Sequence, residues 1–407
     1  MMKALVLCGG IPQVALIKEL QHRGIYTVLA DMNENVVGRK YADKFYPVSV
    51  LDVYGIKSVA EKENVSFIIT ACADQVLLVQ AQVSEILGLP CYISYNTAKA
   101  VSSKEIMKRV FHENGIPTSK YVVMRYFNEK MLKDLTYPLI VKPVDSYSSR
   151  GVKKVFNIKE LKEAYDSAVI ISRTSTAIIE EFVEGEEITV DAYVEEGKAH
   201  ILCVSNIDKI PQSDGFVICR TRYPAKLTEE VYEKVKDIAD NIASAFNLSN
   251  SPMLIQMIVD GSNVSVVEFC ARTGGGEKFR LINEVSKFDV IKAVVDLTLK
   301  KRPHVDDFHL QECIINEFLY VKSGVFDHLE GFEELYKDGM IKEYFLLKSK
   351  GTYCESSKSS GDRVAYYTIK AKSMVLAKSM DIQINSRIKV IDVNGNDILR
   401  HDLIATF

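Results

Sequence analysis

The first hundred residues alternate between strand-like and helix-like segments, and this alternation limits the possible folds more than any other feature. Apolar runs predict strands and one-sided apolar periodicity predicts helices, in the order 3–8, 13–23, 26–30, 67–70 and 74–87. Gly24 and Gly88 follow the two helical segments, as is typical of helix ends. Strands that alternate with helices form a parallel sheet covered on both faces. We therefore predict an N-terminal α/β domain over residues 1–102.

The turn after the first predicted strand contains Gly9 and Gly10, and the next strand ends at Asp31. These features suggest a dinucleotide fold, but residues 8–13 do not match the G-x-G-x-x-G pattern of that fold. A nicotinamide cofactor is therefore the less favoured alternative. Asp31 is interpreted as a polar residue at the carboxyl end of a strand, where open α/β sheets bind ligands.

Length and charge narrow the class of protein. A chain of 407 residues is too long for one core, so two or three domains are expected. Its net charge is −3 and its basic residues are scattered, which argues against nucleic acid as a partner. No apolar stretch approaches the roughly 18 residues that a membrane helix needs. The eight cysteines form no C-x-x-C pair, which is typical of reduced thiols and predicts a cytoplasmic protein without a zinc site.

A short helix is predicted after residue 102, with Lys104 in its first turn. The spacing from Ser102 to Glu105 matches a capping box, and Asn114-Gly115 is a typical helix end. A lysine complements the helix dipole in the last turn, not in the first. Lys104 is therefore either an ordinary solvated lysine or a ligand for an external anion.

A second lysine, Lys142, ends the apolar run 139–143 and precedes a loop rich in small hydroxyl residues, 146–151. Backbone N–H groups and serine hydroxyls of such a loop can bind phosphate oxygens, while the lysine supplies a charge. The lysine precedes the loop, so this is not a Walker A motif. The alternative is an ordinary polar hairpin turn.

A β-hairpin is predicted from the apolar runs 253–259 and 264–270, which flank a short turn that contains glycine. If the loop is 261–263, Gln256 stands opposite Glu268, and directly opposed Cβ atoms are about 5 Å apart. Oxygen ligands at that distance suit Mg²⁺. Arg272 and a run of three glycines follow directly. The alternative is a half-buried hairpin with one glutamate facing solvent.

Arg220 and Arg222 follow a loop that contains glycine, at 212–215. They are candidates for recognising a substrate carboxylate or phosphate. The alternative is that both belong to an exposed strand stabilised by salt bridges.

The order and spacing of these motifs resemble the ATP-grasp superfamily, which includes biotin carboxylase, carbamoyl phosphate synthetase, D-alanine–D-alanine ligase and L-amino acid ligases. The resemblance implies an ATP-grasp domain over 103–300, with a lid subdomain at about 118–182, and a C-terminal α+β domain over 301–407. The fold class expected is thus α/β and α+β, with a parallel N-terminal domain before a two-subdomain core. The C-terminal region is expected to pack on the active site or to form a homodimer contact.

The resemblance also implies roles for individual residues. ATP phosphates would contact Lys104, Lys142 and the lid loop residues Ser146, Ser148, Ser149 and Gly151. The adenosine part would contact Glu180, Glu181, Phe182, Val183 and Glu187. Mg²⁺ or Mn²⁺ would be held by Gln256 and Glu268. Arg272 would steady the transferred phosphate or a substrate carboxylate, and the further candidates for substrate binding are Arg220, Arg222, Gly274 and Gly275.

The implied activity is that of an ATP-dependent carboxylate–amine ligase. It would act on a small acid or amino acid through an acyl phosphate and release ADP and phosphate. Cys270 stands where many members of the family carry asparagine, and a thiol is a poor ligand for a hard cation. Two alternatives stay open: a nucleotide-binding protein without catalysis, and a ligase acting on an amine-bearing phosphosugar.

Overall fold

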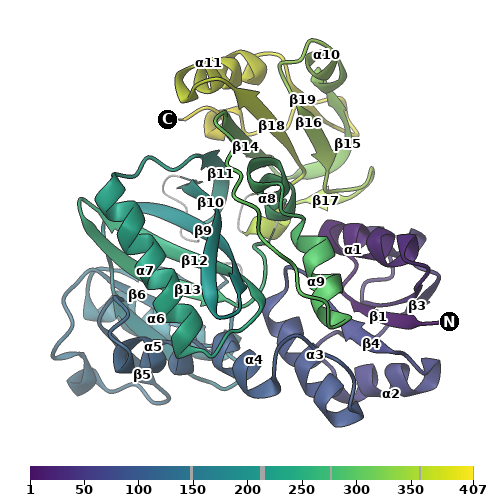
Figure 1. Cartoon of the computed structure of the whole chain (residues 1–407). Helices are drawn as coiled ribbons and strands as arrows, with labels where there is room; N and C mark the ends of the chain where they lie inside the picture. The colour runs from purple at the N-terminus through teal and green to yellow at the C-terminus, as the bar shows by residue number, and fades with distance from the viewer. Residues whose placement is uncertain (147–149, 211–215, 276, 357–358, 407) are drawn as a thin grey trace.

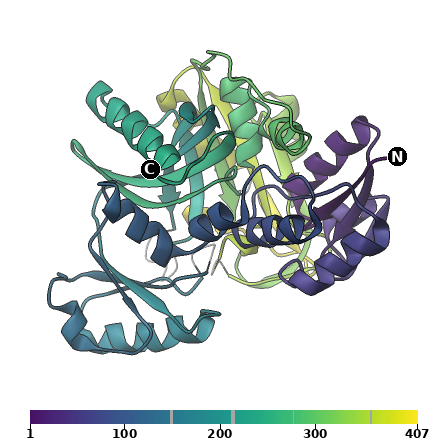
Figure 2. The same ribbon diagram turned by 60° about the horizontal axis from the view of Figure 1, so that its bottom comes forward.

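The structure, a computed structural model, describes residues 1–146, 150–210, 216–275, 277–356 and 359–406. Its parts surround a central sheet, with the N-terminal domain on one side, the lid on another and the C-terminal strands at the top of Figure 1. In Figure 2 the lid stands off from the body as a separate lobe. No helix among these residues is long and apolar enough to cross a membrane.

The N-terminal domain is the predicted parallel sheet, with strand order β3-β2-β1-β4. Its elements are β1 (Lys3–Leu7), α1 (Ile11–His22), β2 (Tyr26–Ala30), η1 (Val37–Lys40), β3 (Lys44–Tyr46), α2 (Val53–Glu63), β4 (Phe67–Ile69), α3 (Asp74–Leu87) and α4 (Tyr95–Ser102). The Asp31 carboxylate accepts a hydrogen bond from the backbone N–H of Gly9 at 2.9 Å. In this structure Asp31 therefore holds the loop between β1 and α1.

The helix that carries Lys104 is α5 (Lys104–Glu113), and its cap differs from the prediction by one residue. Ser103, not Ser102, is the N-cap, because its hydroxyl accepts from the N–H of Ile106. Ser102 is instead the last residue of α4. Glu105 does not complete a capping box and forms an ion pair with Arg125. The prediction that Lys104 lies in the first turn is confirmed.

The lid is an antiparallel sheet of order β5-β8-β6-β7, covered by one helix. Its elements are β5 (Tyr121–Met124), η2 (Glu129–Leu132), β6 (Leu139–Pro143), β7 (Lys153–Val155), α6 (Ile158–Ile171) and β8 (Ala177–Glu181). Leu139, Val141 and Ile179 pack against Leu161 and Ala168 of α6. This small core fixes the ends of β6 and β8, which carry Lys142 and Glu180.

The large sheet has the order β13-β12-β9-β10-β11-β14-β18-β16 and is antiparallel at every pairing given. Its first part comprises β9 (Glu186–Glu195), β10 (Lys198–Lys209), β11 (Ile218–Tyr223), β12 (Ser251–Asp260) and β13 (Asn263–Cys270). On one face, α7 (Glu229–Ala245) packs over β9, β10 and β13. Two more helices, α8 (Lys278–Ser286) and α9 (Val290–Thr298), fill the space between this sheet and the N-terminal domain.

The C-terminal strands continue the large sheet, because β11 pairs with β14 and Arg220 stands opposite Glu317. Sheet pairing therefore crosses the domain boundary expected at 301. The remaining elements are β14 (Cys313–Leu319), β15 (Gly324–Glu330), α10 (Phe332–Lys337), β16 (Glu343–Leu346), β17 (Tyr353–Cys354), η3 (Ser360–Asp362), β18 (Ala365–Ala371), α11 (Met374–Asn385), β19 (Lys389–Asp392) and η4 (His401–Leu403). A smaller sheet, β17-β15-β19, packs beside them.

Candidate active site

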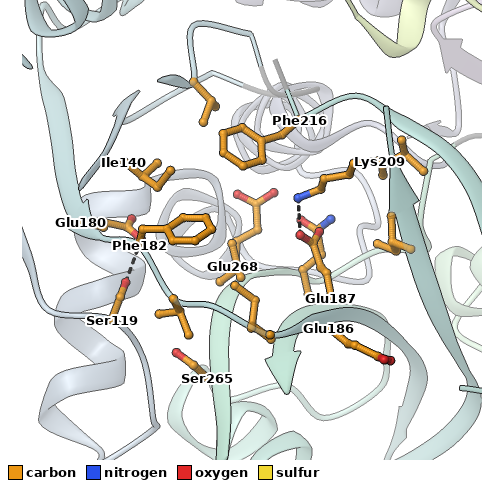
Figure 3. Close-up of a pocket in the computed structure, with 18 of the residues that line it drawn as sticks. Ser119, Ile140, Glu180, Phe182, Glu186, Glu187, Lys209, Phe216, Ser265 and Glu268 are labelled. Carbon is orange, nitrogen blue, oxygen red and sulfur yellow. Dashed lines mark hydrogen bonds and ion pairs between the residues drawn. The ribbon is translucent and has the colours of Figure 1, made fainter. Parts of the chain in front are cut away.

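A cavity of about 560 Å³ lies between the lid and the large sheet. Its volume falls in the range of about 300–1,000 Å³ that is typical of small-molecule sites. The predicted residues that line it are Lys104, Lys142, Ser146, Glu180, Glu181, Phe182, Val183, Glu187, Arg222, Gln256 and Glu268. Residues that lie far apart in the sequence therefore meet at one site (Figure 3).

The hairpin of β12 and β13 places Gln256 opposite Glu268, as predicted, but by a different route. Asp260 pairs with Asn263, so the turn has two residues, one fewer than expected. That turn alone would set Gln256 opposite Val267. A register shift between Gln256 and Met257 compensates by one residue. Such a β-bulge adds a residue to one strand and re-aims the side chains beyond it.

Gln256 and Glu268 offer an amide oxygen and a carboxylate on the same side of the cavity. Oxygen donors of this kind suit Mg²⁺, which keeps waters and substrate phosphates as its other ligands. Among the described residues, no group of three His, Cys, Asp or Glu side chains could hold a metal. Two protein ligands are nevertheless enough for a magnesium that is bound mainly through phosphates, so the residues present fit the ion.

The two predicted lysines reach the cavity from different elements, α5 and β6. Lys104 Nζ lies 3.1 Å from Glu268 Oε2 and donates to the carbonyl oxygen of Ser146 at 2.9 Å. It thereby ties the beginning of the lid loop to the hairpin of β12 and β13. Lys142 Nζ lies 2.8 Å from Glu180 Oε1, and only 5% of Lys142 is exposed. Both ammonium groups are positioned to attract an anion.

The Glu180 carboxylate is buried at the edge of the cavity. Burial alone would raise its pKa, but the ammonium groups of Lys108 and Lys142 outweigh burial and lower that pKa to about 2. The carboxylate is therefore ionised at all ordinary pH values. Lys108, which the sequence interpretation overlooked, is 1% exposed and lies 3.1 Å from Glu180 Oε2.

Part of the cavity has aromatic walls. Phe182 and Ile140 come from the lid, and Phe216 faces them from the other side in Figure 3. Glu187 forms an ion pair with Lys209, whose ammonium also lies 4.9 Å from the Phe216 ring centre. Flat apolar walls beside a polar pair suit a purine base and its sugar.

Several predicted residues lie elsewhere. Arg272 is 9% exposed and its Nη1 donates to the Thr273 carbonyl oxygen at 2.6 Å. It is not among the residues that line the cavity, and neither are Gly151, Gly274 and Gly275. Gly151 has a φ of +79°, and a Cβ there would lie 2.8 Å from Ile171 Cδ1. Ser148 and Ser149 lie outside the described residues.

Arg220 forms salt bridges, as the alternative expected, but it is buried and does not lie on an exposed strand. Its exposed fraction is 0%, and it does not line the cavity. Its guanidinium donates to Glu317 Oε1 at 3.0 Å and to Asp208 Oδ2 at 3.1 Å. It also donates to the carbonyl oxygen of Thr406 at 3.1 Å. Arg222 does line the cavity, and it binds the same Asp208 through two nitrogens.

Replacement of Arg220 by methionine is expected to cost about 3 kcal/mol of unfolding free energy, because it leaves the Glu317 carboxylate buried without its cation. Urea unfolding of both proteins measures this cost. Arg222→Met is the matched control, because the same strand and the same Asp208 are involved at a partly exposed site. It should cost less than about 1 kcal/mol. Equal costs for the two variants would contradict the structural role of Arg220.

Other cavity residues had not been predicted: Lys209, Phe216, Asn206, Asp208, Ser119, Lys378 and Thr406 are examples. Lys378 and Thr406 come from the C-terminal region, and no local pattern marks either. Lys108 did carry a signal, because it lies four residues after Lys104 and therefore on the same face of α5.

Two lysines, a carboxylate and an amide oxygen line one cavity under the lid, and groups of this kind suit a nucleoside triphosphate and its metal. Residues 135–279 match the model of the ATP-grasp domain. The chain therefore carries an ATP-grasp domain over these residues, and its ATP-grasp homologues are ATP-dependent carboxylate–amine ligases.

The individual proteins to which the chain is similar share about a quarter of their residues with it or fewer. The chain is 26% identical over 288 residues to a formate-dependent phosphoribosylglycinamide formyltransferase of Sulfurisphaera tokodaii, which covers 66% of this chain and 70% of the relative. It is 24% identical to the human mitochondrial carbamoyl-phosphate synthase, over 77% of this chain but only 21% of that protein. Among solved structures, an L-amino acid ligase from Bacillus licheniformis has a TM-score of 0.82 at 19% identity and covers 96% of this chain and 99% of its own. This structural likeness confirms the predicted fold class.

Proposed function

We propose that this protein is a ligase that uses ATP to join the carboxylate of an amino acid or small acid to an amine. One observation carries the proposal: Lys104, Lys142, Gln256 and Glu268 surround a single cavity of nucleotide size. Three of these four side chains are charged, and the proposed phosphoryl transfer needs no covalent bond to any of them. Phosphoryl transfer relies mainly on positioning and charge neutralisation, which this set supplies.

The proposed reaction has two steps. A carboxylate oxygen attacks the γ-phosphorus of ATP, and the bond to the bridging oxygen breaks, so that its electron pair leaves with ADP. The amine nitrogen then attacks the carbonyl carbon of the acyl phosphate, the carbon–oxygen bond breaks, and phosphate leaves. The amine proton passes to phosphate or water. The product is an amide.

The residues of the chain would bind and orient ATP. Lys104 and Lys142 would neutralise the phosphates, and Lys104 would also hold the start of the lid loop through its bond to Ser146. Phe182 and Val183 would contact the base, while Glu187 would bind the ribose. Gln256 and Glu268 would hold Mg²⁺ or Mn²⁺, which when bound neutralises charge on the phosphate oxygens.

Two substrate classes are supported by different relatives. The structural likeness to an L-amino acid ligase favours a free amino acid as the acid. The sequence likeness to a phosphoribosylglycinamide formyltransferase favours an amine-bearing phosphosugar as the second substrate. The two classes differ in whether the acceptor carries a phosphate, so one screen can separate them.

Amino acids, small acids and amine-bearing phosphosugars should be tested in pairs with Mg-ATP, and ADP and phosphate should be measured. Substrate-dependent release of both supports the ligase, and the active pair identifies its class. ATP binding without turnover for any pair would favour the catalytically silent alternative.

Removal of divalent metal should abolish the turnover found in that screen. Without the ion, the Glu268 carboxylate would face the phosphate oxygens directly, and like charges repel. Excess EDTA should lower ADP release at least about 100-fold, and added Mg²⁺ should restore it. A rate that is unchanged in EDTA would exclude the role assigned to Gln256 and Glu268.

A further inference from the structure

The ammonium group of Lys108 is buried at the junction of three parts of the active site. Lys108 lies on α5, one turn after Lys104, and it is 1% exposed. A lysine is almost never buried to this extent unless its charge is paired. Its Nζ lies 3.1 Å from Glu180 Oε2 and donates to the hydroxyl groups of Thr118 and Ser119. All three partners belong to segments other than α5.

These partners connect Lys108 to both walls of the cavity. Glu180 belongs to strand β8 of the lid, and Ser119 Oγ donates to Glu180 Oε2 at 3.0 Å (Figure 3). Thr118 Oγ1 donates to the carbonyl oxygen of Val266 at 2.7 Å. Val266 lies on β13, two residues before the proposed metal ligand Glu268. One ammonium therefore links α5, the lid and the metal-binding hairpin.

Glu180 lies between two ammonium groups. Its Oε1 is 2.8 Å from Lys142 Nζ and its Oε2 is 3.1 Å from Lys108 Nζ. One carboxylate between two cations leaves the trio with a net positive charge at the edge of the cavity. If Lys108 were neutral, Glu180 would cancel the charge of Lys142, and less positive potential would face a phosphate.

The electrostatic surroundings of Lys108 agree with this arrangement. Burial lowers the pKa of Lys108 to about 8; Lys142 adds to this effect, while Glu180 and Glu268 oppose it. The group is thus charged at neutral pH and loses its proton as the pH rises through about 8. The other facing groups, the hydroxyls of Thr118 and Ser119, are neutral at these pH values.

We propose that Lys108 is a positioning residue for the phosphate-binding site, which holds Lys104, Lys142 and Glu268 in their relative places through buried contacts. This inference rests on the proposed use of ATP. Lys108 itself is not among the residues that line the cavity, so it acts through Glu180 and Thr118. Small displacements of groups that orient a substrate can cost about 100-fold in rate.

The first test compares Lys108→Met with Lys120→Met. Lys120 is a matched control, because it lies 3.9 Å from the neighbouring carboxylate Glu181 but is mostly exposed. For Lys108→Met, kcat should fall about 100-fold, and affinity for a non-hydrolysable ATP analogue with Mg²⁺ should fall about tenfold. Lys120→Met should behave as the wild type. Equal behaviour of the two variants overturns the proposal.

The second test is the pH profile, which a merely structural role would not change. The wild-type kcat should fall as the pH rises above about 8, because neutral Lys108 no longer offsets Glu180. In Lys108→Arg the guanidinium stays charged, so this fall should disappear. A decline above pH 8 that is identical in the two proteins overturns the proposal.

Two further measurements keep the test decisive. If either Lys108 variant fails to fold, Thr118→Val decides instead, because it removes the hydroxyl that joins Lys108 to Val266 and should lower kcat about tenfold. Wild-type kcat in Thr118→Val then counts against the proposal. Analogue binding by the wild type separates the two hypotheses: no binding refutes the proposed function, whereas normal binding by both the wild type and Lys108→Met refutes only the role of Lys108.

Discussion

Replacing Glu268 by alanine is expected to lower substrate-dependent ADP release by about 10³-fold or more. Glu268 is the only carboxylate of the proposed metal pair, and Lys104 Nζ lies 3.1 Å from it. Its loss removes the charged group of the proposed metal pair and one of the partners that hold Lys104. Loss of one electrostatic group of this kind commonly costs 10²–10³-fold, and here two effects combine. Steady-state rates with saturating Mg-ATP and the active substrate pair provide the measurement.

Asp260→Asn is the control for Glu268→Ala. Asp260 is an exposed carboxylate at the tip of the same hairpin and does not line the cavity. Its rate should equal that of the wild type. The rate of Glu268→Gln should lie between those of Glu268→Ala and Asp260→Asn, because glutamine keeps an oxygen donor without the charge. If Glu268→Ala keeps more than a tenth of the wild-type rate, the hairpin does not hold the catalytic metal.

Replacing Lys142 by methionine is expected to lower kcat by about 10³-fold and to raise the KM for ATP. Lys142 is 5% exposed and lies near the end of β6, where a charge acts on phosphate more strongly because little water screens it. Arginine should not restore the rate, because its planar group does not fit where a compact ammonium was held. The fold should survive, since Lys108 still pairs with Glu180.

Lys153→Met is the matched control for Lys142→Met. Lys153 lies on the adjacent strand β7, opposite Val141, and it is exposed. Its removal should leave kcat and KM unchanged. Thermal unfolding of both variants distinguishes loss of chemistry from loss of structure. A Lys142→Met enzyme with normal turnover and normal stability would remove this lysine from the mechanism.

Local patterns predicted the N-terminal domain well, because residues next to each element there mark where it begins and ends. Tyr26–Ala30 and Asp74–Leu87 have the predicted limits, and Gly88 ends the latter helix with a φ of +64°. The cap of α5 was misassigned by one residue because Ser102 and Ser103 are chemically equal candidates. Only the end of α4 decides between them, and the sequence did not show that helix.

Tertiary contacts determined the features that the sequence did not. The opposition of Gln256 and Glu268 was predicted from a three-residue loop, whereas the structure combines a shorter turn with a bulge. The local sequence does not mark such a bulge, because its position depends on how the strand packs against its neighbour. Arg220 and Arg222 look alike in sequence, yet only Arg220 faces Glu317 on β14. Whether each arginine forms a buried ion pair or faces a ligand therefore depends on β14, a strand about a hundred residues further along the chain.

The continuity of the large sheet has a consequence for how this protein can change over time. The strands beneath the nucleotide cavity and the strands of the C-terminal region share backbone hydrogen bonds through β11 and β14, and the Arg220–Glu317 pair sits on that seam. Recombination could exchange everything after residue 300 for the matching part of a distant homologue. The strand that then replaced β14 would not have the side chains that fit β11. New substrate preferences are therefore expected to arise by substitutions in the loops around the cavity, not by shuffling of the carboxyl-terminal third.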